Sequence, residues 1–341
     1  MLGSLIRFIF SLKIVRIIVI AFLILFIIAF AFALFDEDDN APPSASTTTP
    51  PVETESQNLA FRSNNDGTCS VSGIGACTDA RLLIPSTSPS GDTVTAIDPQ
   101  AFVDCSRLTS VSIPASVTRI GSWAFSGCSG LTSITVPNSV TSIGASAFVG
   151  CSGLTRIAVA SGNPVYHSSN NCLIETASRT LILGCKTSII PTDGSVTNIG
   201  NGAFYNCSEL ASITVPNNVT SIMQYAFRGC SGLTSIVVPD SVISMGDGVF
   251  CDCSGLISVS VGSGIASIGP AVFYGCTSLI SVNIPDGVTS IGTNAFYGCS
   301  ALTSIAYQGT QGQWDSVSKA PGWNTLSGDY IVHCTDGDVS K

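Results

Sequence analysis

One 23-residue unit repeats through most of this 341-residue chain. In eight places an Ala-Phe or Val-Phe pair is followed, three residues after the Phe, by a cysteine. Successive units keep a 23-residue spacing except for one interval of 56 residues. A unit this short cannot enclose a core of its own, so neighbouring units must stack and share one, which predicts a repeat solenoid. The repeated phenylalanines are Phe102, Phe125, Phe148, Phe204, Phe227, Phe250, Phe273 and Phe296.

The unit LTSITVPNSVTSIGASAFVGCSG, residues 131–153, shows how each turn of the solenoid is expected to form. Leu131, Ile134 and Val136 are expected to point inward from a short strand. Pro137 ends this strand because proline has no N–H to donate. A second apolar stretch then returns to the interior, and the ASAFVGC segment is predicted to form one helical or 3-10 turn that buries Phe148 and Cys151. Stacked about 4.8 Å apart, such units align their inward side chains in continuous columns.

The N-terminal part of the chain has the features of a membrane anchor. Residues 17–35 are 19 consecutive apolar residues, enough for a helix to span a bilayer core of about 30 Å. Residues 1–16 carry three basic and no acidic side chains, which predicts a short cytoplasmic segment and an extracellular location for everything after residue 35. A cleaved signal peptide is the alternative, because Ala31-Phe32-Ala33 resembles a cleavage site.

The remaining residues divide into a stalk, a solenoid and two caps. Residues 36–66 are rich in Ser, Thr and Pro, and such a composition favours a disordered stalk. The first repeat and an N-terminal cap are predicted in 67–107, the main solenoid in 108–301, and a C-terminal cap in 302–341. The 56-residue interval is interpreted as enlarged turns within 154–209 through which the stack continues, with NCLIE and TLILGC pairing like a hairpin. In the last cap, Trp314, Trp323 and a strand at 330–334 are expected to cover the end of the core.

Fourteen cysteines allow two interpretations. Beyond a membrane segment, cysteines often form disulfides. Eight of them, however, share one repeat position beside the buried Phe, where a small apolar group packs well, so we expect free buried thiols there. Cys172 with Cys185 and Cys69 with Cys77 are the better candidates for disulfides.

Composition excludes several classes of function. Charged residues make up only 10% of the chain and the net charge is −9, whereas a nucleic-acid-binding protein needs clustered Lys and Arg. His167 and His333 are the only histidines, and the chain has no Gly-rich phosphate loop and no metal-ligand spacing. We therefore expect a protein that is not an enzyme and has no metal or cofactor.

The repeat pattern IPxSVTSIGxxAFxGCSGLTSI resembles the BspA-like leucine-rich-repeat family. The inserted GNPVYHSSNNCLIETASRTLILGC and the ending GTQGQW…CTDGDVSK are also similar to elements of BspA-like proteins, so the resemblance covers about residues 67–341. It implies a leucine-rich-repeat solenoid with a parallel sheet on the concave side, and short second strands and helical or 3-10 turns on the other sides. It also implies adhesion or protein recognition at a cell surface.

The position after the repeat Phe is the best candidate for a binding surface. The outward strand positions are small and nearly uncharged, whereas large aromatic and Arg side chains dominate binding energy. We call the larger side chains after and two residues before the repeat Phe the strip; they could also lie flat over their own turns. The strip comprises Trp123, Tyr205, Tyr225, Arg228, Tyr274 and Tyr297.

Together these features predict a single-pass membrane protein whose extracellular solenoid acts as an adhesion or recognition module. Host or neighbouring-cell surface proteins or glycans are the expected partners, and nucleic acid is not. The alternative is a secreted protein, or a purely structural surface-coat repeat without a specific ligand.

Overall fold

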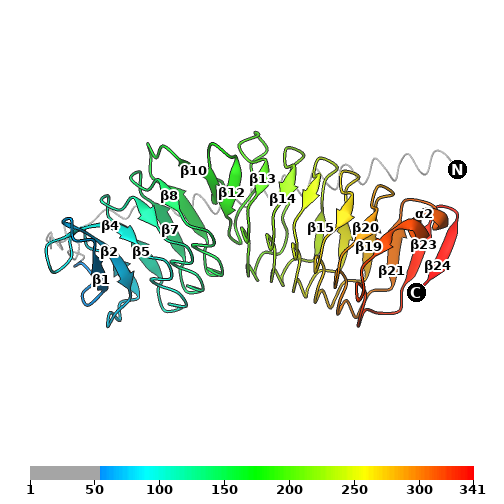
Figure 1. Cartoon of the computed structure of the whole chain (residues 1–341), viewed down its shortest axis with the longest axis horizontal. Helices are drawn as coiled ribbons and strands as arrows, with labels where there is room; N and C mark the ends of the chain where they lie inside the picture. The colour runs from blue at the N-terminus through cyan, green and yellow to red at the C-terminus, as the bar shows by residue number, and fades with distance from the viewer. Residues whose placement is uncertain (1–53) are drawn as a thin grey trace, which may run out of the picture. The chain divides into compact units, whose positions relative to one another are not determined.

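The computed structural model describes residues 54–341, which form one solenoid, as the repeat predicted (Figure 1). The predicted cytoplasmic segment 1–16, the predicted membrane segment 17–35 and residues 36–53 of the predicted stalk lie outside the described residues. The last part of the predicted disordered stalk is ordered, because Ala60–Ser63 form a strand that pairs with the next one. Among residues 54–341, no helix combines the length and the hydropathy that crossing a bilayer requires.

The first strand of each repeat lies on one side of the solenoid. These strands pair in parallel with a shift of one 23-residue unit, so that Ser258 lies beside Ser281 and Ser281 beside Ser304. The column is divided into two sheets, with no strand over residues 210–215. One sheet contains β3 (Arg81–Leu83), β5 (Ser110–Ser112), β7 (Ser133–Val136) and β9 (Arg156–Val159). The other contains β15 (Ser235–Val237), β17 (Ser258–Ser260), β19 (Ser281–Ile284), β21 (Ser304–Tyr307), β23 (Ile331–Cys334) and β24 (Gly337–Ser340).

A second column consists of shorter strands, most of two residues. Its first sheet contains β1 (Ala60–Ser63), β2 (Thr68–Gly73), β4 (Thr93–Ile97), β6 (Arg119–Ile120) and β8 (Ser142–Ile143). Its second contains β10 (Tyr166–Ser169), β11 (Cys172–Glu175), β12 (Thr180–Leu183), β13 (Asn198–Ile199), β14 (Ser221–Ile222) and β16 (Ser244–Met245). A third contains β18 (Ser267–Ile268), β20 (Ser290–Ile291) and β22 (Ser318–Lys319).

The third side is built from β-turns, which corrects the expected helical or 3-10 turn. Around Phe125 two successive turns close with i to i−3 hydrogen bonds, from Ser126 N–H to Trp123 C=O at 3.1 Å and from Cys128 N–H to Phe125 C=O at 3.2 Å. The N–H groups that alternate with these donors, those of Phe125 and Gly127, instead donate to the next repeat. The Phe125 N–H, for example, donates to Ala147 C=O at 2.7 Å. Backbone groups committed to a neighbouring repeat cannot also form a helix. We call this side the turn wall.

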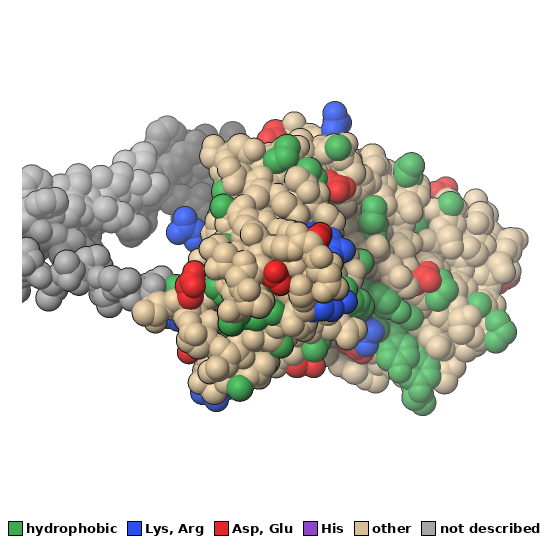
Figure 2. Space-filling model, turned by 60° about the vertical axis from the view of Figure 1, so that its left-hand side comes forward, with side chains coloured by type: hydrophobic (Ala, Val, Ile, Leu, Met, Phe, Trp, Pro, Cys, Tyr) green, Lys and Arg blue, Asp and Glu red, His purple; other side chains and the backbone are tan. Residues whose placement is uncertain are grey.

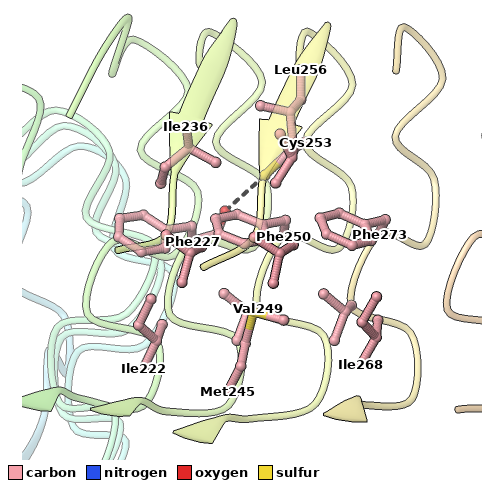
Figure 3. Packing of buried hydrophobic residues seen from close by; sticks show 14 of the residues in the cluster. Ile222, Phe227, Ile236, Met245, Val249, Phe250, Cys253, Leu256, Ile268 and Phe273 are labelled. Atoms are coloured by element: carbon pink, nitrogen blue, oxygen red, sulfur yellow. Dashed lines mark hydrogen bonds between the residues drawn. The ribbon is translucent and has the colours of Figure 1, made fainter. Parts of the chain in front are cut away.

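The core is a set of stacked columns. Neighbouring Phe rings within each run stack with centroids 5.1 to 5.7 Å apart, and Figure 3 shows Phe227, Phe250 and Phe273 in one row. The repeat cysteine lies beside this row, and its thiol donates to the carbonyl of the Phe one repeat earlier, as Cys253 does to Phe227 C=O at 3.0 Å. Burial raises the pKa of the Cys253 thiol to about 12. The sulfur therefore serves as a buried donor and not as a thiolate.

All fourteen cysteines are unpaired, which confirms free thiols at the repeat position. The two candidate disulfides are not formed. Cys172 has its thiol directed at the carbonyls of Asn170 and Ile189, and Cys185 at the hydroxyl of Thr187, 3.2 Å away. Each therefore has a polar partner of its own in the inserted region.

The 56-residue interval divides the core of the solenoid into two clusters. The antiparallel pairing predicted for NCLIE and TLILGC is present as β11 and β12, and β12 then continues in parallel with β13. The chain continues through this interval as one compact unit, but the buried core separates into two clusters here and both strand columns break. We call the junction between the Phe148 turn and the Phe204 turn the seam.

The C-terminal cap closes the core as predicted. Trp314 is buried in the short helix α2 (Gln311–Ser316), which begins with a capping box at Thr310. The ring of Trp323 meets Phe296 edge-on at 5.8 Å, and its carbonyl accepts the bond that a further repeat would take from Phe296 N–H. Strand β23 pairs in parallel with β21 and completes the covering of the core at this end.

Candidate binding cleft

All six strip residues lie on the turn wall, where their side chains are only partly buried. Trp123 is the most open, with 46% of its surface exposed. Figure 2 shows hydrophobic side chains gathered in one region of a surface that is otherwise mostly polar and uncharged.

The structure brings four of the six together. Trp123, Tyr205, Tyr225 and Arg228 line one cleft with a volume of about 680 Å³, within the range of about 300–1,000 Å³ typical of ligand sites. Tyr274 and Tyr297 do not line it. They form a separate pair whose rings stack in parallel with centroids 4.9 Å apart, which confirms the spacing expected of neighbouring repeats.

The cleft lies at the seam because the turn wall carries only small side chains there. Between Trp123 and Tyr225, the position two residues before the Phe is filled by Ser146 and then by Gly202. Both line the cleft, together with Gly150, so its floor consists of small residues. Trp123 and Tyr225, with these two turns between them, therefore form its two ends.

Arg228 holds the aromatic side chains at one end of the cleft. Its guanidinium lies 5.7 Å from the ring centre of Tyr205 and 5.4 Å from that of Tyr225, so it makes a cation–π contact with each. It also pairs with Asp252 at 3.2 Å. The ion pair neutralises the cation locally, and the two rings are held in fixed positions beside the cleft.

Two of these aromatic residues adopt an unusual backbone conformation. Trp123 has a φ of 61° and Tyr225 a φ of 57°, in the left-handed region where bulky residues are uncommon. The equivalent position is a glycine at Gly202 and Gly248, which adopts this conformation without steric cost. Gln100, Ser146, Ala271 and Asn294 have the same conformation at this position, so it belongs to the repeat and not to the cleft alone.

Several polar residues of the cleft were not identified from the sequence. Asp104, Asn201, Asn206 and Gln224 line it and are exposed. Asp104 and Asn206 share the position two residues after the repeat Phe, which is glycine in most repeats, so the departure from glycine could have indicated them.

The histidines lie elsewhere. His167 Nδ1 is 2.8 Å from the hydroxyl of Thr176, and His333 Nδ1 is 2.9 Å from the carboxylate of Asp338. In residues 54–341, no three His, Cys, Asp or Glu side chains are grouped as a metal site. The arrangement at the cleft is suited to binding by contact and hydrogen bonds.

Comparison with known proteins identifies the repeats. Residues 86–194 and 197–316 match the model of the BspA type leucine rich repeat region, in six copies. A leucine rich cell surface protein from Faecalibacterium prausnitzii is 24% identical, with a TM-score of 0.57 over 82% of this chain and 98% of that one. A leucine-rich repeat protein from Eubacterium ventriosum is 19% identical, with a TM-score of 0.54 over 83% of this chain and 98% of that one.

The pneumococcal vaccine antigen PcpA has a similar fold, at 19% identity and a TM-score of 0.53 over 74% of this chain and 67% of that one. At these identities the likeness to solved structures shows the fold alone. Among curated proteins, no sequence relative was found.

Proposed function

This chain belongs to the BspA-type leucine-rich repeat family, and from that premise we propose that it is a recognition or adhesion module at the cell surface. Residues 17–35 tether it to the membrane, and the solenoid binds surface proteins or glycans of a host or neighbouring cell through the cleft at the seam. The binding role of the strip is thereby centred on Trp123, Tyr205, Tyr225 and Arg228.

The cleft is the observation that carries this proposal. Trp, Tyr and Arg supply most of the binding energy at protein surfaces, and four such side chains converge on one concave site here. The outward strand positions offer much less, because the column Ser258, Ser281 and Ser304 has only small hydroxyl side chains. A specific ligand would therefore gain more contact area at the cleft than on the sheet.

The proposed membrane tether is supported by the apolar sequence of residues 17–35 and by the basic residues before them. The similar solenoid from Faecalibacterium prausnitzii is described as a cell surface protein, which supports the same location for this chain. Extracellular display would give the cleft access to large partners on other cells.

The experiment is a capture assay with the full chain in detergent against host-surface and matrix preparations. The proposal expects saturable binding that weakens at least tenfold in a variant carrying both Tyr205→Ala and Arg228→Ala. The matched control carries Ser258→Ala and Ser281→Ala on the sheet and should bind like the unmodified protein. Absence of saturable binding would favour a structural surface-coat role, and greater loss in the serine variant would place the site on the sheet.

A further inference from the structure

The backbone hydrogen bonding of the turn wall is interrupted at the seam. Elsewhere, neighbouring turns are joined across this wall by three backbone hydrogen bonds, such as those from Trp123 N–H to Ala145 C=O at 3.1 Å and from Gly127 N–H to Val149 C=O at 2.9 Å. One turn further on, the equivalent N–H groups of Ser146 and Gly150 donate to no group of residues 54–341. The seam therefore interrupts a ladder that is otherwise regular.

The backbone carbonyl groups on the other side of the seam also lack hydrogen bonds from residues 54–341. The carbonyls of Asn201 and Tyr205 occupy the positions that would receive these two bonds, and within the described chain they accept none. All four residues line the cleft. Backbone groups of this kind are satisfied by water or by a ligand. The cleft thus presents donors on one side and acceptors on the other, between aromatic side chains.

We propose that this cleft binds a neutral glycan, an inference that rests on the proposed recognition function. A sugar hydroxyl both donates and accepts, so a chain of hydroxyls can satisfy the donors of one turn and the acceptors of the next. The apolar C–H face of a sugar ring packs on an aromatic ring, and Trp123 exposes 46% of its surface at one end. Tyr225, which is partly buried, lines the other end.

The side chains of the cleft agree with such a ligand. Asp104, Asn201 and Gln224 are exposed and make no side-chain hydrogen bond within residues 54–341, so they are available to hydroxyl groups. The one basic side chain that lines the cleft, Arg228, is paired with Asp252. An anionic ligand would find no unpaired cation there among residues 54–341, whereas a neutral polar ligand needs none.

An inserted peptide strand fits less well. A strand bonding both turns would have to lie between them, because its N–H and C=O groups point to opposite edges. The seam is closed at that point: a Cβ placed on Gly202 would lie 3.1 Å from Cγ2 of Val149. The ligand must therefore lie over the seam, as a glycan with outward-reaching hydroxyls can.

The test uses the full chain in detergent and a panel of neutral probes: the β-1,4-linked hexamers of glucose, N-acetylglucosamine and galactose, and neutral O-glycans released from mucin. Titration calorimetry should detect saturable binding of at least one probe, with a change in tryptophan fluorescence. Trp314 is buried and Trp323 packs in the C-terminal cap, so that fluorescence change should disappear in Trp123→Ala.

The variants separate this inference from the proposed function. Trp123→Ala should weaken binding at least tenfold and Gln224→Ala at least threefold. Tyr297→Ala, an aromatic change on the same wall outside the cleft, should stay within twofold. Failure of every probe, or equal loss in Tyr297→Ala, overturns the glycan inference. If a deglycosylated protein binds and this binding needs Trp123, the glycan inference is wrong while the recognition function stands. If no partner's binding depends on the cleft, both are wrong.

Discussion

Gly184 occupies the place of a repeat phenylalanine directly beside Phe204. Its N–H donates to Ala203 C=O at 2.8 Å, as Phe204 N–H does to Ala226 C=O at 2.7 Å one turn later. Cys207 directs its thiol at the Gly184 carbonyl, although at 3.9 Å, where other repeat cysteines face a Phe carbonyl. The missing side chain leaves room for the Phe204 ring, so the ring column begins again at this point.

Replacing Gly184 with alanine should destabilise the solenoid. The new Cβ would lie 2.0 Å from Cε1 of Phe204, and the ring is fully buried and cannot move freely. Overpacking of this kind costs about 1–3 kcal/mol, which thermal or denaturant unfolding of the full chain in detergent would measure. Gly312→Ala is the control, because nothing lies within 4 Å of a Cβ there and alanine favours its helix. Equal stability of the two variants would contradict the proposed packing at the seam.

Phe227→Ala should remove one ring from the middle of a column. The side chain is fully buried between Phe204 and Phe250, with centroids 5.1 and 5.6 Å away. Emptying such a position costs about 3–5 kcal/mol in the free energy of unfolding. Denaturant titration would detect it, and a loss below about 1 kcal/mol would show that the ring is not part of the core.

The 23-residue period was sufficient to predict the regular turns and the buried Phe and Cys columns, because their inward positions recur in phase. The closing role of Trp314 was predicted instead from the end of the repeat pattern after Leu302. Gly184 could not be found in this way, since it lies 20 residues before Phe204 and no Ala-Phe pair marks its turn. The cleft could not be predicted from the period either. Trp123 and Tyr205 have no periodic relationship, and they share one site only because the wall is interrupted between them.

The buried thiols should make the protein sensitive to alkaline pH. Burial raises the pKa of Cys128, Cys207, Cys253 and Cys299 to about 12, above the ordinary thiol value of 9.0. Above pH 9 the unfolded chain releases these protons while the folded chain keeps them, so stability is complete below pH 9 and is lost as the pH rises toward 12. Each thiol contributes about 1 kcal/mol per pH unit in that interval.

Melting temperatures between pH 7 and pH 11 would check this. Cys253→Ser keeps a hydrogen-bond donor near Phe227 C=O but cannot ionise, so its melting temperature should fall less steeply with pH. A melting temperature that does not change from pH 8 to pH 11 would contradict the assignment of buried, protonated thiols.

Removing the Tyr274 and Tyr297 rings should have little effect on the fold. Both side chains are only partly buried on the turn wall, and exposed substitutions usually change stability by less than about 0.5 kcal/mol. Because the pair lies outside the cleft, the double alanine variant should also keep its affinity for a ligand of the cleft. Binding and unfolding are measured on the same preparation. A tenfold loss of affinity would extend the binding site along the whole strip.

Protease added to intact cells should remove the solenoid and leave a membrane-bound fragment that contains residues 17–35. The basic residues of 1–16 favour the cytoplasmic side, so every site after residue 35 should be exposed to the enzyme. Cleavage should occur first in 36–53, where Ser, Thr and Pro predominate and the chain has few apolar residues to bury. Mass spectrometry of the fragment identifies both ends, and cells permeabilised before digestion provide the control for access. A mature protein that begins near Leu34 would instead show that Ala31-Phe32-Ala33 is cleaved, and the solenoid would then be secreted without this anchor.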